Sequence, residues 1–378
     1  MAGIYLHVPF CKTRCNYCDF YSTTRDEVRE RYIRALCREL ELRNNYLENE
    51  PVETIYFGGG TPSQLSHSDF EKIFTTLNKE YDIQNCGEIT IEANPDDLTP
   101  EYINKLTTLP FNRISIGMQT FNDKLLRLLN RRHTANQAIR AVEECRKAGF
   151  RNISIDLMYG LPGETLKDWV ADLETAISLN PEHISAYHLI YEEGTPLYKM
   201  LQKQQITEVN EELSVSFFSL MIERLTQAGY QHYEISNFCK PDMYSRHNSS
   251  YWTGKKYLGC GPSAHSFNGE SRQWNVSSLE QYLEGIECGA PCFEVEPLDT
   301  VTRYNDFVIT SLRTMWGLPL AHLKEEFGEE LLQYCLGNAK NYLESGKLEI
   351  KDNTLFLTKE GIFISDGIMS DLLWVEEE

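Results

Sequence analysis

The chain has 378 residues, of which 41% are hydrophobic, which is enough apolar material for one large core or two domains. Its net charge of −20 disfavours binding to nucleic acid or to anionic membrane surfaces, and no basic run offsets this charge. No apolar stretch is long enough to span a bilayer, and the first residues lack the basic and apolar regions of a signal peptide. We therefore expect a cytoplasmic protein without a transmembrane segment. Its eleven cysteines then favour free thiols or metal ligation over disulfides.

The first half of the chain alternates short β-rich runs with amphipathic helical patterns. The predicted strands are residues 3–8, 52–57, 88–93, 113–117, 152–158 and 183–188. The predicted helices are residues 26–45, 66–81, 100–107, 122–129, 134–148 and 165–179. The pairs Ser66 with Asp69 and Thr165 with Asp168 have the spacing of capping boxes, and Thr99 precedes Pro100 at a helix start. This alternation predicts parallel βα units, in a doubly wound sheet or a partial barrel.

The alternation fades after about residue 195. Residues 208–228 have the pattern of a helix, and residues 229–275 have the composition of a loop. Two further helical patterns at 303–314 and 329–345 precede a short hairpin that turns at Asp352-Asn353. Helices followed by a hairpin indicate a mostly helical, winged-helix-like C-terminal domain. We divide the chain into residues 1–230, a connecting region 231–299, and a C-terminal domain 300–378.

Polar or glycine-rich sequence follows the predicted strands, where both architectures place their ligands. The groups in question are the cysteines after the first strand, Gly58-Gly59-Gly60-Thr61-Pro62 after the second, Glu92 in the third, Gln119 after the fourth and Asp156 in the fifth. Loops with no common role would not be expected to share such polar or glycine-rich sequence. The pattern therefore predicts one ligand site at the carboxyl ends of the strands.

Three cysteines, Cys11, Cys15 and Cys18, lie within eight residues of the first strand-end loop. Thiolates are soft ligands that suit iron–sulfur clusters and zinc. A structural zinc site usually has four ligands, and His7, inside the predicted strand, is the only nearby candidate for the fourth. Three thiolates on a four-iron cluster would leave one iron open to a substrate. The spacing favours the cluster, with zinc as the alternative.

These motifs together resemble the radical S-adenosylmethionine (SAM) superfamily, and within it the HemN/HemW group. The matching segments are residues 5–11 (YLHVPFC), 57–62 (FGGGTP), 114–121 (ISIGMQTF), 156–163 (DLMYGLPG) and the C-terminal helices. The resemblance implies an α/β fold with a partial (β/α)6 TIM-like barrel in place of an open sheet. It also implies a [4Fe-4S] cluster on the three cysteines, whose open iron binds the amino and carboxylate groups of SAM.

The same resemblance implies a set of residues around the cluster and SAM. Tyr5 and Tyr17 would line both groups, and Gly59, Gly60 and Thr61 would approach the SAM amino group, because glycine lets the backbone come close to a ligand. The remaining implied contacts are Glu92, Gln119, Arg131 and Asp156. The two carboxylates can accept hydrogen bonds from ribose hydroxyls or an ammonium, and the guanidinium can pair with the SAM carboxylate.

Three features favour a haem chaperone of the HemW type over the oxygen-independent coproporphyrinogen III oxidase. Phe20 stands where the oxidase pattern has a fourth cysteine. The first predicted strand begins at about residue 3, which leaves no room for the N-terminal extension of the oxidases. Residues 247–252 (HNSSYW) match the His-Asn-x-x-Tyr-Trp motif associated with haem binding, in which His247 would ligate the iron through a neutral imidazole.

The resemblance therefore implies a protein that binds the cluster, SAM and haem and delivers haem to apo-haemoproteins such as respiratory enzymes. It further implies homodimerisation on haem binding and peripheral association with the membrane through partner proteins. The alternatives are the porphyrinogen oxidase, a HemN-like radical methyltransferase and an electron-transfer protein. Whether the chain is an enzyme stays open at this point.

Overall fold

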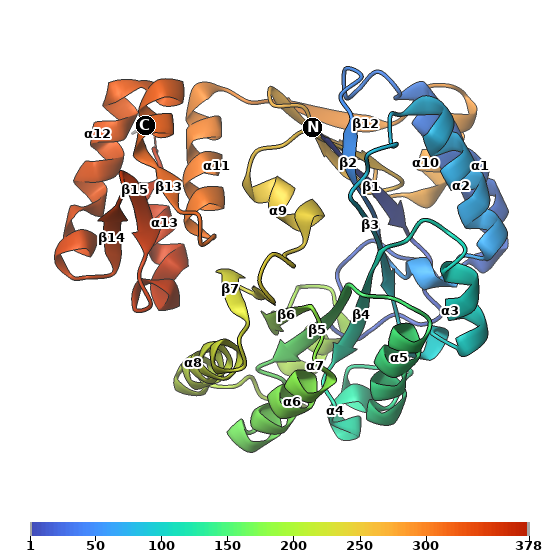
Figure 1. The fold of residues 1–378 in the computed structure, drawn as a ribbon, viewed down its shortest axis with the longest axis horizontal. Helices are drawn as coiled ribbons and strands as arrows, with labels where there is room; N and C mark the ends of the chain where they lie inside the picture. Colours follow the sequence, from blue (N-terminus) through green and yellow to red (C-terminus); the bar gives the residue numbers. More distant parts are fainter. Residues whose placement is uncertain (1, 376–378) are drawn as a thin grey trace.

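The computed structural model describes residues 2–375 and builds them around a sheet of twelve strands in the order β12-β11-β10-β9-β1-β2-β3-β4-β5-β6-β8-β7 (Figure 1). Six parallel strands form its centre, and the prediction of parallel βα units is confirmed. They are β1 (Ala2–Val8), β2 (Val52–Gly59), β3 (Glu88–Ala93), β4 (Arg113–Gln119), β5 (Ile153–Tyr159) and β6 (His183–His188). The six strands are neighbours in chain order, as in a barrel and unlike a doubly wound sheet, and the order does not close, so they form a partial barrel.

Helices cover the outer face of these strands (Figure 1). They are α1 (Arg29–Leu42), α2 (His67–Glu80), α3 (Pro100–Leu106), α4 (Asp123–Leu128), α5 (Ala135–Lys147) and α6 (Leu166–Leu179). Both predicted capping boxes are present, at the starts of α2 and α6, and the Thr99 hydroxyl accepts a hydrogen bond at the start of α3. A third capping box, Thr134 with Gln137, begins α5. Two helices follow the barrel, α7 (Pro196–Gln202) and the predicted α8 (Glu211–Gln227).

The prediction of a loop over residues 229–275 is wrong. This region contains α9 (Arg246–Trp252) and five strands, β7 (Gln231–Glu234), β8 (Asn237–Cys239), β9 (Tyr257–Cys260), β10 (His265–Phe267) and β11 (Ser271–Asn275). Each strand has only three to five residues, too few to show a periodic pattern. With β12 (Phe293–Pro297), these strands extend both edges of the central sheet, and α10 (Leu279–Glu287) lies between β11 and β12 in the chain.

The C-terminal part has a separate apolar core around Tyr304, Val308 and Cys335. It comprises α11 (Thr300–Leu312), β13 (Leu318–Pro319), α12 (Leu320–Glu344), β14 (Leu348–Lys351), β15 (Thr354–Leu357) and α13 (Ser365–Leu372). The label α12 covers two helical segments that meet at a kink at Gly328, where φ is 89°, and the helix predicted at 329–345 corresponds to the second segment. The predicted hairpin is confirmed, with positive φ at Asp352 and Asn353. In residues 2–375 no helix has the length and apolar content that crossing a bilayer requires.

Candidate functional site

A cavity of about 440 Å³, the strand-end cavity, lies at the carboxyl ends of the central strands. Its wall contains most of the predicted site residues, namely Cys11, Cys15, Tyr17, Cys18, Gly59, Gly60, Thr61, Glu92, Gln119, Arg131 and Asp156. They come from β2, β3, β4 and β5 and from the loops after β1 and α4. The structure thus brings together residues that are as much as 145 positions apart (156 − 11). Tyr5 and His247 lie outside this wall.

The three cysteines are half-buried free thiols that face the same cavity. The sulfur of Cys11 lies 3.3 Å from the Thr61 hydroxyl, and the guanidinium of Arg131 donates to the sulfur of Cys15 at 3.4 Å. Burial raises the pKa of the Cys18 thiol to about 11, and it also raises the pKa of Cys11. These thiols would therefore lose their protons on binding a metal, as thiolate ligation requires.

The donor arrangement suits a cluster better than a single zinc ion. Across residues 2–375, no three His, Cys, Asp or Glu side chains lie close enough to share one metal ion. His7, the candidate fourth zinc ligand, is buried, and its ring nitrogens lie 3.2 Å from the Tyr5 hydroxyl and 2.9 Å from the Tyr21 carbonyl oxygen. The three thiols face one cavity, and their ligation of a four-iron cluster with one open iron stays a prediction.

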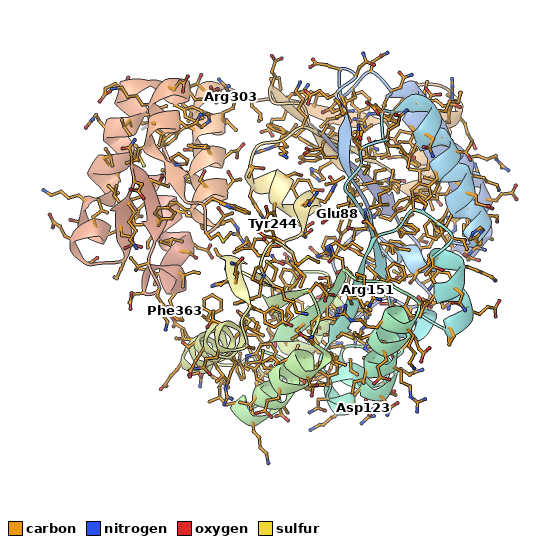
Figure 2. The ribbon with its side chains drawn as sticks, viewed as in Figure 1. Glu88, Asp123, Arg151, Tyr244, Arg303 and Phe363 are labelled. Carbon is orange, nitrogen blue, oxygen red and sulfur yellow. The ribbon has the colours of Figure 1, made fainter. Side chains whose placement is uncertain are left out.

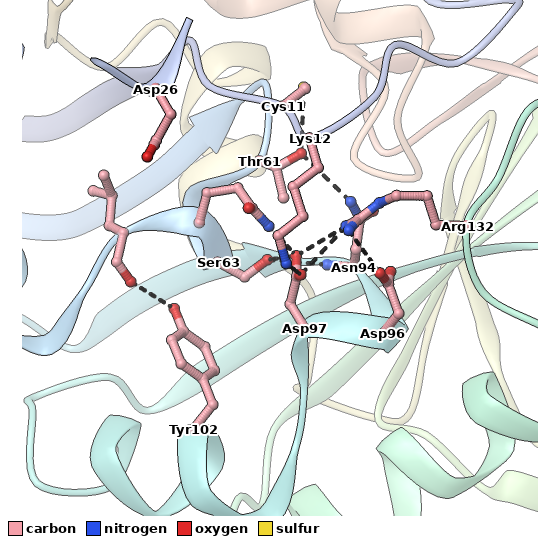
Figure 3. A network of polar contacts seen from close by, with 12 residues as sticks. Cys11, Lys12, Asp26, Thr61, Ser63, Asn94, Asp96, Asp97, Tyr102 and Arg132 are labelled. Carbon is pink, nitrogen blue, oxygen red and sulfur yellow. Dashed lines mark hydrogen bonds and ion pairs between the residues drawn. The ribbon is translucent and has the colours of Figure 1, made fainter. Parts of the chain in front are cut away.

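A buried carboxylate, Asp97, anchors the cysteine loop (Figure 3). Asp97 accepts hydrogen bonds from the Lys12 ammonium at 2.9 Å, the Ser63 hydroxyl at 2.8 Å and the Arg132 guanidinium at 3.3 Å. Lys12 directly follows Cys11, so Asp97 ties the cysteine loop to the segments after β2 and α4. We did not predict this residue, although Pro95-Asp96-Asp97 follows the third strand as the other polar groups follow theirs.

The substitution Asp97→Asn is expected to loosen the cysteine loop. It removes the buried negative charge that pairs with Lys12 and Arg132. We therefore expect the free energy of unfolding to fall by about 1–3 kcal/mol. The reconstituted protein should also hold less iron per chain. Asp26→Asn is the matched control, because Asp26 is an exposed acid that pairs with Arg29 in the same region. Equal urea denaturation midpoints and equal iron contents in the two variants would contradict this role.

Two buried polar groups in the cavity wall lack partners. The side-chain oxygen of Gln119 and the Nε atom of Arg131 are buried, and neither has a hydrogen-bond partner. Gln119 also has a φ of 62°, a strained value for a residue with a side chain. Buried polar atoms are nearly always satisfied, so these two indicate that a polar ligand completes the site. Arg131 is positioned by Asn94, which accepts from its Nη2 atom at 2.7 Å and which we did not predict.

Two carboxylates make the cavity suited to a cationic ligand. Glu92 accepts a hydrogen bond from the Tyr56 hydroxyl at 2.8 Å, and Asp156 accepts from the Ser115 hydroxyl at 3.3 Å. Burial raises the pKa of the Glu92 carboxyl to about 7, an effect that the hydrogen bond from Tyr56 opposes, and burial also raises the pKa of Asp156. A bound ammonium or sulfonium would favour the ionised form of both groups.

The raised pKa of Glu92 predicts a pH-dependent contribution to stability. The folded protein keeps this proton up to a pH of about 7, whereas the unfolded chain releases it near 4.5. The contribution is therefore fully present below 4.5 and is lost as the pH rises through 7. We expect Glu92→Gln to flatten the decline in unfolding free energy between pH 5 and 8, measured by urea denaturation. The exposed Glu101→Gln is the control, and an unchanged slope in Glu92→Gln would contradict the shift.

The glycines at the end of β2 and directly after it, Gly59 and Gly60, are required by the approach of β1. A Cβ atom on Gly60 would lie 2.9 Å from the Val8 oxygen, and one on Gly59 would lie 2.7 Å from the His7 ring. Gly59 also has a φ of 106°, which favours glycine. The Gly60 amide donates to the Val8 oxygen at 2.8 Å. Close packing thus accounts for these glycines, and their approach to the SAM amino group stays a prediction.

His247 lies at the opposite ends of the strands from the cysteines. It is on α9 and only 1% exposed, and its ring nitrogens lie 2.8 Å from the Thr54 hydroxyl and 2.8 Å from the Tyr251 hydroxyl. Glu88, at the start of β3, accepts from the backbone amides at the start of α9 (Figure 2). The expectation that His247 lies in a loop is therefore wrong, and the role of His247 as a haem ligand stays a prediction.

Tyr5 packs against His247 and against Tyr56, a residue of the cavity wall. Its ring is 6.1 Å from that of Tyr56 and 6.4 Å from that of His247, in stacked orientations. Phe20, in contrast, is 64% exposed and forms part of the cavity wall beside the cysteines. The residue at the position of the fourth oxidase cysteine is thus accessible from solvent.

Two family models match this chain, the Radical SAM superfamily over residues 5–176 and the HemN C-terminal domain over residues 298–364. The Heme chaperone HemW of Bacillus subtilis is 33% identical, and the alignment covers 99% of each chain. The protein of the same name from Buchnera aphidicola subsp. Schizaphis graminum is 39% identical over 98% of each chain. The Mycobacterium tuberculosis protein is 34% identical over 98% of this chain and 94% of its own.

Among solved structures, coproporphyrinogen III oxidase (HemN) from Escherichia coli has a TM-score of 0.86 and covers 98% of this chain and 90% of its own. It is 23% identical, so the likeness shows the fold, a mostly parallel α/β barrel followed by a helical C-terminal part. The similarity to these relatives and the cavity lined by three cysteines support the same family. This chain belongs to the radical SAM superfamily and, within it, to the HemN/HemW group.

Proposed function

We propose that this chain is a haem chaperone that holds a [4Fe-4S] cluster and SAM and delivers haem to apo-haemoproteins such as respiratory enzymes. The observation that carries the proposal is the near full-length similarity to proteins named Heme chaperone HemW. Phe20 and the match of residues 247–252 to a haem-binding motif support it. Haem-linked homodimerisation, a cytoplasmic location and delivery at the membrane through partner proteins belong to the same proposal.

The residues of the strand-end cavity would have distinct roles in this function. Cys11, Cys15 and Cys18 would ligate the cluster, which when bound would supply an open iron and an electron for SAM chemistry. Arg131 and Gln119 have free polar atoms for the methionine part of SAM, and Glu92 and Asp156 accept from its ammonium or ribose hydroxyls. Tyr17 closes the wall beside the cysteines, while Thr61 holds Cys11 in place.

Haem ligation by His247 would require α9 to move away from the amino ends of β1, β2 and β3, where His247 is buried. Both ring nitrogens have partners, and burial lowers the pKa of the ring to about 3, so the imidazole is neutral as ligation requires. If His247 ligates haem, hydrogen exchange at the amino ends of β1, β2 and β3 should accelerate when haem is added. Unchanged exchange with full haem occupancy would remove His247 as the ligand.

An anaerobic experiment on the reconstituted full-length chain tests the proposal. We expect it to bind haem, to transfer that haem to an apo-haemoprotein, and to form no protoporphyrinogen from coproporphyrinogen III and SAM. Transfer is measured as the absorbance of the acceptor, and the porphyrinogen by its oxidised fluorescent product. Formation of protoporphyrinogen would overturn the proposal in favour of the oxidase, and an absence of haem binding would overturn the chaperone function itself.

A further inference from the structure

A second cavity, of about 650 Å³, lies between the central sheet and the C-terminal helices. Figure 1 shows α9 between the barrel strands and α11, and this cavity has α9 in one wall and α11 and α12 in the other. Its volume lies within the range of about 300–1,000 Å³ that is usual for small-molecule sites, and such sites often lie between domains. We propose that haem binds in this interdomain cavity with His322 as a ligand to its iron. The inference rests on the proposed haem-binding function.

Aromatic side chains form both walls of the interdomain cavity. On the barrel side, the ring of Tyr257 lies 4.7 Å from that of Tyr251 and 6.2 Å from that of Phe267. On the C-terminal side, the rings of Phe307 and Phe327 are 5.6 Å apart. Flat apolar surfaces that face each other across a cavity suit a flat macrocycle, which can bury both of its faces against them.

His322 supplies an imidazole that is free to ligate. It lies in the first turn of α12, is exposed, and lines the cavity. Its ring packs edge-on against Phe307 at 5.1 Å, and it has no hydrogen bond with any of residues 2–375. His247 is the opposite case, buried with both nitrogens bonded. Haem iron favours a neutral imidazole nitrogen, and His322 can provide one without a change of fold.

Two arginines in the wall can receive the propionates of haem. Arg303, near the start of α11 (Figure 2), pairs with Glu326 at 2.9 Å. Arg272, on β11, pairs with Asp306 and, through its other terminal nitrogen, with Glu296 at 3.7 Å. Both guanidinium groups are partly exposed, and each has five N–H donors, more than its present carboxylate partners use. The remaining donors can pair with the carboxylates of an added ligand.

The helix α9 belongs to the walls of both cavities. Asn248 lines the strand-end cavity, whereas Tyr251 and Trp252 line the interdomain cavity. The guanidinium of Arg313 lies 5.2 Å from the centre of the Trp252 ring, so this ring is held against the C-terminal domain. Haem in the interdomain cavity would therefore contact two residues of the predicted haem-binding motif while His247 keeps its position.

Haem titration of the cluster-loaded, full-length chain under anaerobic conditions tests this site. We expect His322→Ala to raise the Kd for haem by roughly tenfold or more and to change the Soret spectrum, because an axial ligand is lost. Metal-free protoporphyrin IX should bind His322→Ala as well as the original chain, since it has no iron to ligate. His265→Ala is the matched control, an exposed histidine outside the cavity that stacks on Trp274.

Arg303→Ala should weaken the binding of both haem and protoporphyrin IX, because both molecules carry propionates. Unchanged haem affinity and an unchanged spectrum in His322→Ala would overturn the inference. If His247→Ala lost haem while remaining folded and His322→Ala kept it, the interdomain site would be wrong and the proposed function would stand. If the unaltered chain bound no haem, both would fail.

Discussion

Replacement of any one of Cys11, Cys15 and Cys18 by serine is expected to abolish the [4Fe-4S] cluster of the reconstituted protein. The three thiols are the cysteines that line the strand-end cavity, and a serine hydroxyl is a hard, weakly acidic ligand that does not replace a thiolate on iron. Even changes in groups that merely orient metal ligands cost roughly tenfold or more in metal affinity. We therefore expect at least about a tenfold loss of bound iron and sulfide, with loss of the cluster absorbance.

Cys37→Ser is the matched control for these variants. Cys37 is also half-buried and free, but it lies on α1 and does not line the strand-end cavity. It should keep the iron content of the unaltered chain. Full iron content in any of the three cysteine-loop variants, or an equal loss in Cys37→Ser, would contradict the ligand assignment. Thermal unfolding of each cluster-free variant separates loss of a ligand from loss of the fold.

The central strands and their ligand loops were predictable because their signals are local. The six parallel strands have six to eight residues each and are mostly buried, so their runs of apolar residues stand out from the helices between them. Parallel strands also place their carboxyl ends at one edge of a sheet. This topology alone predicts that residues far apart in the sequence, such as Thr61 and Asp156, lie close together. The prediction needs no knowledge of side-chain contacts.

The rest of the molecule depends on contacts that no local pattern encodes. Glu39 is an example, because its buried carboxylate accepts hydrogen bonds from the Gly261 amide, the Asn275 side chain and the Tyr282 hydroxyl. These partners are more than 200 positions away along the chain. In the sequence Glu39 is one of several acids in an amphipathic helix. Non-local contacts also concealed Asp97, whose partners are 33 to 85 positions away, and the position of α9, whose first amides bond to Glu88.

His247→Ala is expected to destabilise the fold whether or not His247 binds haem. The substitution removes a buried ring that stacks 5.1 Å from Tyr56, and it leaves the hydroxyls of Thr54 and Tyr251 without their partner. Loss of packing and two unsatisfied hydroxyls should lower the free energy of unfolding by about 2–4 kcal/mol. Urea denaturation of the cluster-free, haem-free chain measures this effect. The exposed His265→Ala should change it by less than about 0.5 kcal/mol.

The pH dependence of the same variant tests the burial of this ring. Burial lowers the pKa of His247 to about 3, whereas the unfolded chain takes up the proton near 6.5. The stability that neutral His247 contributes is therefore present above pH 6.5 and is lost as the pH falls toward 3. His247→Ala should flatten that part of the acid-side decline, and an equally steep decline would show that the ring is accessible. Because destabilisation also weakens haem binding, a loss of haem in His247→Ala identifies a ligand only where the variant remains folded.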